Sequence, residues 1–148
     1  MPRVPDGERV PRVSVFRIDM TPLIVVAAAV IEHDGCYLVT RRQRGVHLEG
    51  FWEFPGGKCD AGESLDRCLA RELREELAVD AVVGHELLVT THTYPDRTVE
   101  LHFIGCQLRG TPAPQLGQAM QWVPKRDLPM LEFPPADAEL IALLSNER

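Results

Sequence analysis

The pattern of apolar and polar positions predicts a domain built from strands and helices. An apolar run from Leu23 to Ile31 is followed by a turn at Asp34-Gly35, and apolar residues resume over 36–40, which is typical of a hairpin between two buried strands. A second hairpin is expected from the strand-like segments 86–93 and 99–108, which flank the turn-forming residues 94–97. A further short strand is predicted at 119–123, and a loop, short strand and glycine turn at 49–57.

Helical spacing marks two other segments. Between Ser64 and Leu77 a leucine recurs at every fourth position, which places one stripe toward the core, and Ser64 is of a type that caps a helix. A second helix is predicted over 136–144, behind Pro134-Pro135. Strands that alternate irregularly with two helices favour an α/β/α sandwich with a mixed central sheet over an all-parallel, doubly wound fold.

The length and composition indicate one soluble domain. A chain of 148 residues can bury a single sizeable core, and 45% hydrophobic with 26% charged residues is ordinary for a globular protein. Residues 1–21 carry three prolines and several charges without a clear period, so we expect a partly disordered extension there. The folded domain is predicted over 22–148.

The charge of the chain narrows the class of ligand. A formal net charge of −6 would repel a nucleic-acid backbone, so polymeric DNA or RNA is not an expected partner. A small phosphorylated ligand could still bind through metal ions. The expected partner is therefore a small molecule, with a monomer and a homodimer both left open.

The apolar segments and the cysteines indicate a cytoplasmic protein. The longest apolar run has nine residues, which is too short to span a bilayer, and the acidic residues before it argue against a signal peptide. The four cysteines, at 36, 59, 68 and 106, form no Cys-x-x-Cys pair, which argues against a zinc site or a dithiol redox centre. Reduced thiols in a cytoplasm are expected.

Three carboxylates crowd one face of the first predicted helix. At about 100° per residue, Glu72, Glu75 and Glu76 fall within roughly a 100° arc beside the leucine stripe. Like charges this close repel unless a cation neutralises them, and Mg²⁺, with Mn²⁺ as an alternative, prefers such oxygen ligands. The competing interpretation is a solvated helix face in which Arg71 pairs with Glu75 at i, i+4.

The spacing of the neighbouring residues favours the metal site. The string Gly57-x5-Glu63-x7-Arg71-Glu72-Leu73-x-Glu75-Glu76-x-Ala78 resembles the Nudix box and matches its pattern except at Ala78, where the family has glycine. Glycine serves there as a left-handed helix cap, and alanine in that conformation costs about 1 kcal/mol. The departure affects stability slightly and leaves the chemistry intact.

The resemblance implies roles for the residues of the box and for others beyond it. Glu72, Glu75 and Glu76 would bind the metals, with Glu63 close by and the Gly56 carbonyl as a further ligand. Catalysis would involve these carboxylates: Glu72 would activate the attacking water, and Arg71 would orient Glu72 and Glu75. MutT-like features continue in order from residue 23 to 144. By this analogy the nucleotide would be bound by Arg42 and His47 near the phosphates and by Arg97, the Phe54 backbone and Asp137 around the base.

Two positions depart from MutT-like enzymes. Asp137 stands where MutT has asparagine, and an ionised carboxylate accepts two hydrogen bonds from a guanine edge but repels the N3 lone pair of cytosine unless it is protonated. This favours a purine. The alternative is that Asp137 merely benefits from the dipole of the last helix. Leu116 stands where many relatives carry a glutamate, so one outer metal ligand or base is missing.

The function implied by the resemblance is that of a MutT-like nucleoside triphosphate pyrophosphohydrolase. It would convert an oxidised nucleotide such as 8-oxo-dGTP to the monophosphate and pyrophosphate, sanitising the nucleotide pool and so contributing to DNA repair. One alternative is a CTP or modified-dCTP pyrophosphohydrolase of the same family. Another is a nucleotide-binding Nudix module without turnover, which should have lost box carboxylates that are all present here.

Overall fold

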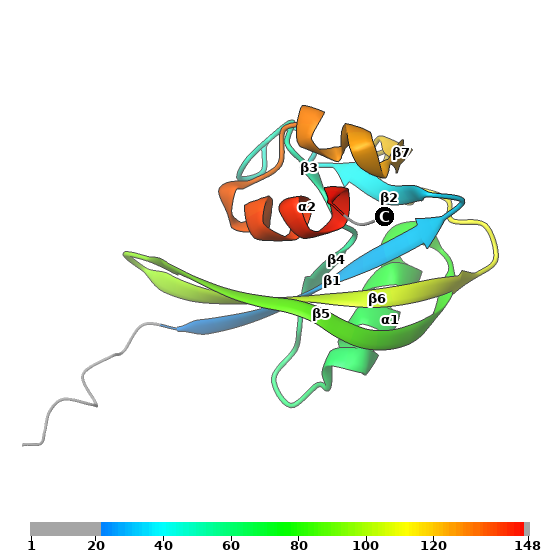
Figure 1. The fold of residues 1–148 in the computed structure, drawn as a ribbon. Coiled ribbons are helices and arrows are strands. Elements are labelled where there is room, and N and C mark those ends of the chain that lie inside the picture. Colours follow the sequence, from blue (N-terminus) through cyan, green and yellow to red (C-terminus); the bar gives the residue numbers. More distant parts are fainter. Residues whose placement is uncertain (1–21, 147–148) are drawn as a thin grey trace, which may run out of the picture.

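The sheet is built around β1, a long strand with a neighbour on each side (Figure 1). The structure is a computed structural model that describes residues 22–146, so the extension predicted for residues 1–21 lies outside the described residues and the domain boundary stays a prediction. The strands are β1 (Leu23–His33), β2 (Cys36–Arg41), β3 (Trp52–Glu53), β4 (Gly56–Lys58), β5 (Asp80–Tyr94), β6 (Arg97–Arg109) and β7 (Met120–Pro124).

Parallel and antiparallel pairs both occur in this sheet. β1 runs parallel to β6 and antiparallel to β2 and β4, while β5 pairs antiparallel with β6. The order of the main path is β3-β2-β1-β6-β5, with β4 paired to β1 and β7 to β2. The predicted mixed sheet is therefore confirmed.

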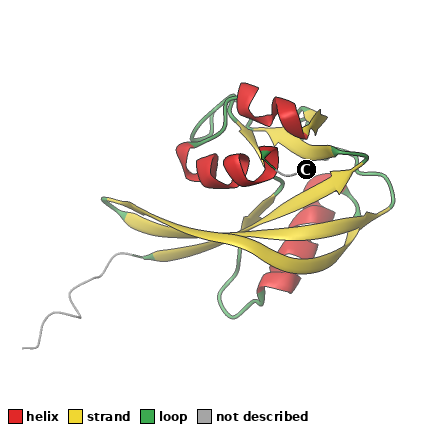
Figure 2. Cartoon of the chain, in the orientation of Figure 1, coloured by secondary structure: helices red, strands yellow, loops and turns green. Residues whose placement is uncertain are grey.

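Helices cover both faces of the sheet (Figure 2). On one face lies α1 (Leu65–Leu77), whose fully buried Leu69, Leu73 and Leu77 pack into a cluster with Ala27 and Ala29. On the other face lies α2 (Ala138–Ser145), which packs with the 3-10 helix Lys125–Met130 against the opposite side of β1 and β6. Successive residues of a strand point to opposite faces, so β1 supplies both cores. The predicted α/β/α sandwich is confirmed.

The local predictions agree with the structure wherever a turn or cap residue marks the boundary. Asp34 and Gly35 both have positive φ (52° and 78°) at the tip of the β1–β2 hairpin. The Ser64 side chain accepts a hydrogen bond from the Arg67 amide (3.2 Å) at the start of α1. Ala78 takes the left-handed conformation at its end (φ 51°), as predicted for the position of the family glycine.

Three elements differ from their predicted extents. β5 and β6 are longer than the segments 86–93 and 99–108, and their register shifts between Val83 and Leu88. The last helix begins with a 3-10 turn at Pro135–Asp137, and regular α-helix starts only at Ala138. Within residues 22–146 no helix is long and apolar enough to cross a membrane.

The prediction of four reduced cysteines is wrong for one pair. Cys59 and Cys68 form a disulfide, while Cys36 and Cys106 are free. The two half-cystines are nine residues apart in sequence, one in the loop after β4 and the other in the first turn of α1. A search for Cys-x-x-Cys spacing does not detect such a pair.

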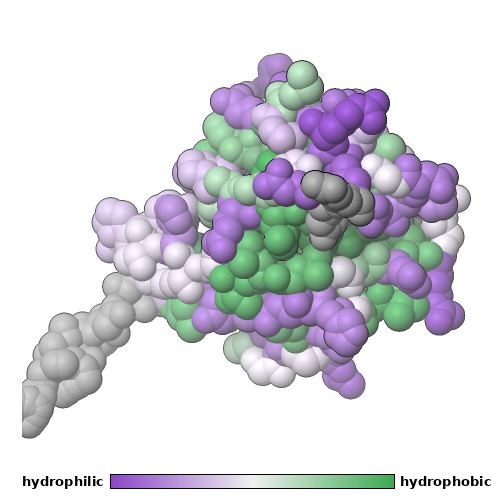
Figure 3. Space-filling view, viewed as in Figure 1, coloured by the Kyte–Doolittle hydropathy of each residue, from purple (hydrophilic) through white to green (hydrophobic). Residues whose placement is uncertain are grey.

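Apolar surface is visible where α2 lies above β5 and β6 (Figure 3). The exposed large apolar residues of these elements include Leu87 and Val89 on β5 and Leu143 on α2, each more than 40% exposed. Such residues are common on the surface of soluble domains. The oligomeric state, monomer or homodimer, stays a prediction.

Candidate active site

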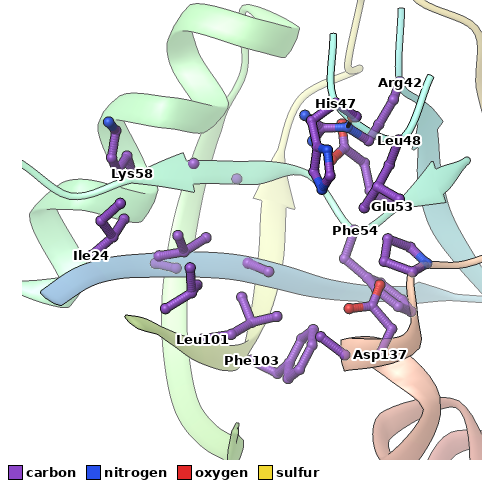
Figure 4. A pocket seen from close by; sticks show the side chains of 18 of the residues that line it. Ile24, Arg42, His47, Leu48, Glu53, Phe54, Lys58, Leu101, Phe103 and Asp137 are labelled. Carbon is purple, nitrogen blue, oxygen red and sulfur yellow. Dashed lines mark hydrogen bonds and ion pairs between the residues drawn. The ribbon is translucent and has the colours of Figure 1, made fainter. Parts of the chain in front are cut away.

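One cavity of about 460 Å³ brings together all the residues predicted to bind substrate. Its floor comes from β1 and β6, and Figure 4 shows Arg42, His47 and Glu53 together at one end, near Phe54 and Asp137. Arg97 lines the same cavity from the tip of the β5–β6 hairpin. Residues separated by up to 95 positions in sequence thus meet in one place, as the family resemblance implied. The predicted residues in the lining are Arg42, His47, Phe54, Arg97 and Asp137.

Arg42 is held in place by Glu53 and by the backbone of the 42–51 loop. Its guanidinium donates to Glu53 Oε1 (2.7 Å) and to the His47 carbonyl (2.6 Å). Burial raises the pKa of Glu53 more than the Arg42 charge lowers it. Glu53 is a functional candidate that the sequence analysis missed. Its only signal in the sequence was its place between Trp52 and Phe54, because its partner Arg42 is eleven residues away.

Asp137 is a buried acid that lines the same cavity as Glu53. Its side chain is 5% exposed and makes no capping hydrogen bond with α2. Burial, and then the charge of Glu53, raise the pKa of Asp137 to about 7. Burial is the larger of the two causes, so the charged form of Asp137 is disfavoured in this cavity. Asp137 can therefore present either a carboxylate or a neutral acid near neutral pH.

Aromatic side chains shape the rest of the cavity. Phe54 stacks on Phe133 with ring centres 5.4 Å apart and meets Phe103 edge-on at 6.1 Å. Arg97 lies 5.2 Å above the Tyr94 ring, which also lines the cavity and was not predicted. An apolar and aromatic wall of this kind suits a flat base.

The carboxylates of the Nudix-like string gather around Arg71. The guanidinium donates to both oxygens of Glu63 (2.8 and 2.9 Å), to Glu72 (2.9 Å) and to Glu75 (3.3 Å). These bonds hold the pKa of Glu63 at about 2 and raise the pKa of Arg71. Glu63 lies beside the cluster and Arg71 contacts Glu72 and Glu75, although the Arg71–Glu75 pair is also the one that the competing solvated-face interpretation predicts. The roles of these residues stay a prediction. Glu75 lies at the rim, with its side chain 60% exposed.

The two glycines of β4 are required by close packing. A Cβ atom on Gly57 would lie 2.2 Å from Glu72 Oε1, so the Glu72 carboxylate sits directly over this glycine. A Cβ atom on Gly56 would lie 2.0 Å from the Ala27 carbonyl oxygen of β1. A larger residue at Gly56 would push β4 away from the β1 backbone, whereas a larger residue at Gly57 would displace the Glu72 carboxylate itself.

Glu76 connects the carboxylate cluster to the cavity. It lines the cavity together with Gly56, and the pKa of Glu76 is raised to about 8, first by burial and then by the charges of Glu72 and Glu53. A cation would relieve this repulsion. The available donors are carboxylate oxygens and a backbone carbonyl, which are the ligands that Mg²⁺ and Mn²⁺ prefer, so the residues present fit a hard divalent metal.

The loop that carries Leu116 borders the same cluster. The Gln115 amide and the Gln118 side chain both donate to the Glu76 carbonyl (2.9 and 3.2 Å), which fixes the loop against the end of α1. Leu116 itself is 55% exposed and lines a smaller cavity with Glu53 and Glu76. The position where relatives carry a glutamate is therefore beside the cluster and is occupied here by an apolar side chain.

Comparisons with known proteins agree with this geometry. The chain is 36% identical over 127 residues to the 8-oxo-dGTP diphosphatase of Haemophilus influenzae, an alignment that covers 84% of this chain and 93% of the relative. It is 35% identical over 120 residues to the CTP pyrophosphohydrolase of Escherichia coli, covering 80% and 89%. Among solved structures, that of the E. coli ORF135 protein superimposes with a TM-score of 0.75 at 34% identity, covering 82% of this chain and 88% of that one.

The family follows from the extent of these matches. The model of the NUDIX domain matches residues 26–143, which include every strand except the first residues of β1, both helices over most of their length and all the candidate site residues. The relatives are aligned over most of both chains. This chain belongs to the Nudix domain family and resembles its MutT-like members.

Proposed function

We propose that this chain is a MutT-like nucleoside triphosphate pyrophosphohydrolase that converts an oxidised dNTP such as 8-oxo-dGTP to the monophosphate and pyrophosphate. The observation that carries the proposal is the continuity of the base-sized cavity with the carboxylate cluster through Gly56 and Glu76. A nucleotide with its base between Phe54 and Asp137 would direct its phosphates toward that end. Such an enzyme would act on the nucleotide pool of the cytoplasm.

The divalent cation would be Mg²⁺, with Mn²⁺ able to replace it. Its ligands would come from Glu63, Glu72, Glu75, Glu76 and the Gly56 carbonyl. Bound there, it would supply positive charge opposite the negative charge that develops on the phosphate oxygens during hydrolysis. Glu75 is the outermost of these groups and would have to leave Arg71 to take part.

Other side chains of the site would bind the phosphates and activate the attacking water. Arg42, fixed by Glu53, and His47 would bind the phosphates. Arg71 holds the Glu72 carboxylate over Gly57, and from there Glu72 would accept a proton from the attacking water. A nucleotide-binding module without turnover is disfavoured, because all four box carboxylates are present and three of them, Glu63, Glu72 and Glu75, meet at Arg71.

The raised pKa of Asp137 also supports the second candidate, a CTP or modified-dCTP pyrophosphohydrolase. In its ionised form Asp137 accepts two hydrogen bonds from the N1 and N2 hydrogens of a guanine edge. In its neutral form it donates to N3 of cytosine and accepts from the N4 amine. Since the pKa of Asp137 is about 7, the neutral form is available and the preference for a purine is weaker than the sequence alone suggested.

The decisive experiment measures pyrophosphate release from 8-oxo-dGTP, dGTP, CTP and dCTP across pH 6 to 9 with Mg²⁺. A guanine substrate should bind better as pH rises through 7, and a cytosine substrate should bind better as it falls. Glu72→Gln is expected to lower turnover by about 10²–10⁴-fold while nucleotide binding is retained. Glu32→Gln, which removes an exposed carboxylate outside the cavity, is the matched control. An unaltered rate in Glu72→Gln would refute the assigned role.

A further inference from the structure

The Cys59–Cys68 disulfide joins the two elements that carry the metal-binding candidates. Cys59 directly follows β4, and Cys68 is the fourth residue of α1 and is fully buried. The sulfur atoms of Cys59 and Cys68 and a carboxylate oxygen of Glu63 all lie within 4.8 Å of one another. The Cys68 sulfur is also 3.8 Å from the Gly57 carbonyl oxygen. The covalent link thus lies beside the β4 backbone and beside Glu63, one of the metal-binding candidates.

The disulfide closes a short loop that contains Glu63. Within this loop the Asp60 amide donates to Glu63 Oε1 (2.9 Å), and Arg71 of α1 donates to both Glu63 oxygens. Arg71 also donates to the Lys58 carbonyl (3.2 Å), just before the first cysteine. The position of Glu63 therefore depends on one covalent link and on a few polar contacts with Arg71 and Asp60.

A second cavity gives access to one of the two sulfurs. It has a volume of about 470 Å³ and is lined by Lys58, Cys59, Asp60 and Glu63, with His102 of β6 across from them. Cys59 is partly exposed, while Cys68 is buried and does not line the cavity. A thiol entering from solvent would reach the Cys59 sulfur and leave Cys68 as the departing group.

We propose that Cys59 and Cys68 form a redox site whose co-reactant is a small dithiol or a protein dithiol. A thiolate of the reductant attacks the Cys59 sulfur, the Cys59–Cys68 bond breaks, and Cys68 leaves as a thiolate that takes a proton. The second thiol of the reductant then attacks its own sulfur in the mixed disulfide and releases Cys59. Two electrons and two protons pass to the cysteines, and the reductant becomes a disulfide.

Reduction changes the site because it removes the covalent restraint on the Glu63 loop. In the oxidised form Glu63 is kept beside Arg71 and the turn of β4. In the reduced form residues 59–64 can open, so backbone amide exchange in this segment is expected to rise at least tenfold. The effect on catalysis rests on the proposed function: the Mg²⁺ concentration for half-maximal hydrolysis is expected to rise about three- to tenfold on reduction.

The site itself is tested by counting thiols in the full chain. After mild oxidation, unfolding and alkylation, mass spectrometry should find two modified cysteines, Cys36 and Cys106, and after treatment with a dithiol it should find four. Cys59→Ser should behave as the reduced protein in amide exchange and in Mg²⁺ dependence, whatever the redox conditions. Cys36→Ser, which removes a free thiol, is the matched control and should keep the full response.

Two results would overturn the proposal. One is four alkylated cysteines under all oxidising conditions, since the pair then does not form. The other is identical amide exchange over residues 59–64 in the oxidised and reduced proteins, since the link then restrains nothing. Absence of hydrolysis in both states would instead contradict the proposed function, and the thiol count and exchange would still decide the redox site.

Discussion

Asp137 gives the sharpest test of how burial sets charge in this cavity. The pKa of Asp137 rises from 3.8 to about 7, first through burial and then through Glu53. Each pKa unit corresponds to about 1.4 kcal/mol, so a shift of about 3 units amounts to about 4 kcal/mol. Well below pH 4 the acid is protonated in both the folded and the unfolded chain, and it contributes no difference.

The sign of the effect follows from which state holds the proton. Between pH 4 and 7 the unfolded chain loses its proton from Asp137 while the folded chain keeps it, so the free energy of unfolding falls as pH rises. Above pH 7 the folded protein contains a buried carboxylate, and the loss is complete. Asp137→Asn carries a neutral side chain of nearly the same shape at every pH. Its stability relative to the original protein should therefore increase by up to about 4 kcal/mol from pH 4 to pH 8.

Urea unfolding at intervals between pH 4 and 8 measures this difference, and subtraction of the two curves removes the other titrating groups. Asp34→Asn is the matched control, because it also removes one carboxylate, but from a side chain that is 87% exposed. It should show only a small change with pH. A difference between Asp137→Asn and the original protein that does not vary with pH would refute the buried, neutral Asp137.

Two further substitutions test the site around Glu76. Leu116→Glu places a carboxylate where relatives have one, so the Mg²⁺ concentration for half-maximal hydrolysis should fall severalfold. Leu116→Gln is the uncharged control. Equal metal dependence in the two variants would contradict the assignment of the metal site beside Leu116. Glu53→Gln removes the ion-pair partner of Arg42, a contact worth about 1 kcal/mol, so KM for the nucleotide should rise about fivefold in steady-state assays. The same variant should move the pH transition of Asp137 downward in urea unfolding, because Glu53 contributes to its raised pKa; an unmoved transition would show that the two acids are not coupled.

The parts of the fold that could be predicted are those with local signals. Asp34-Gly35 fixes a hairpin, Ser64 starts a helix, and the leucine spacing identifies its buried face, because each depends on residues within a few positions. The full lengths of β5 and β6 depend instead on their pairing with each other. The polar residues at the ends of these strands do not indicate that the pairing continues. The 3-10 helix Lys125–Met130 contains Pro129 and has no helical period.

The site was predicted best where residues share one helix and worst where they come from different elements. The spacing of Glu72, Glu75 and Glu76 on α1 already places them together. Glu53 could not be singled out in this way, because its importance comes from a short strand that brings it near Arg42 and places its charge where it affects Asp137. The disulfide was missed for the same reason, since it joins a loop to a helix.

The distribution of charge in the cluster indicates how metal and nucleotide would arrive. Within residues 22–146, Arg71 forms ion pairs with Glu63, Glu72 and Glu75 but none with Glu76, which faces the cavity. The acid without an ion-pair partner is thus at the end where phosphates would enter, and with a pKa of about 8 it keeps its proton near neutral pH. A cation alone would bind weakly there, because Arg71 already pairs with the outer carboxylates and Glu76 would have to release its proton. Phosphates alone would be repelled by the carboxylates. Each would bring the charge that the other needs, so we expect Mg²⁺ and nucleotide to bind with positive cooperativity.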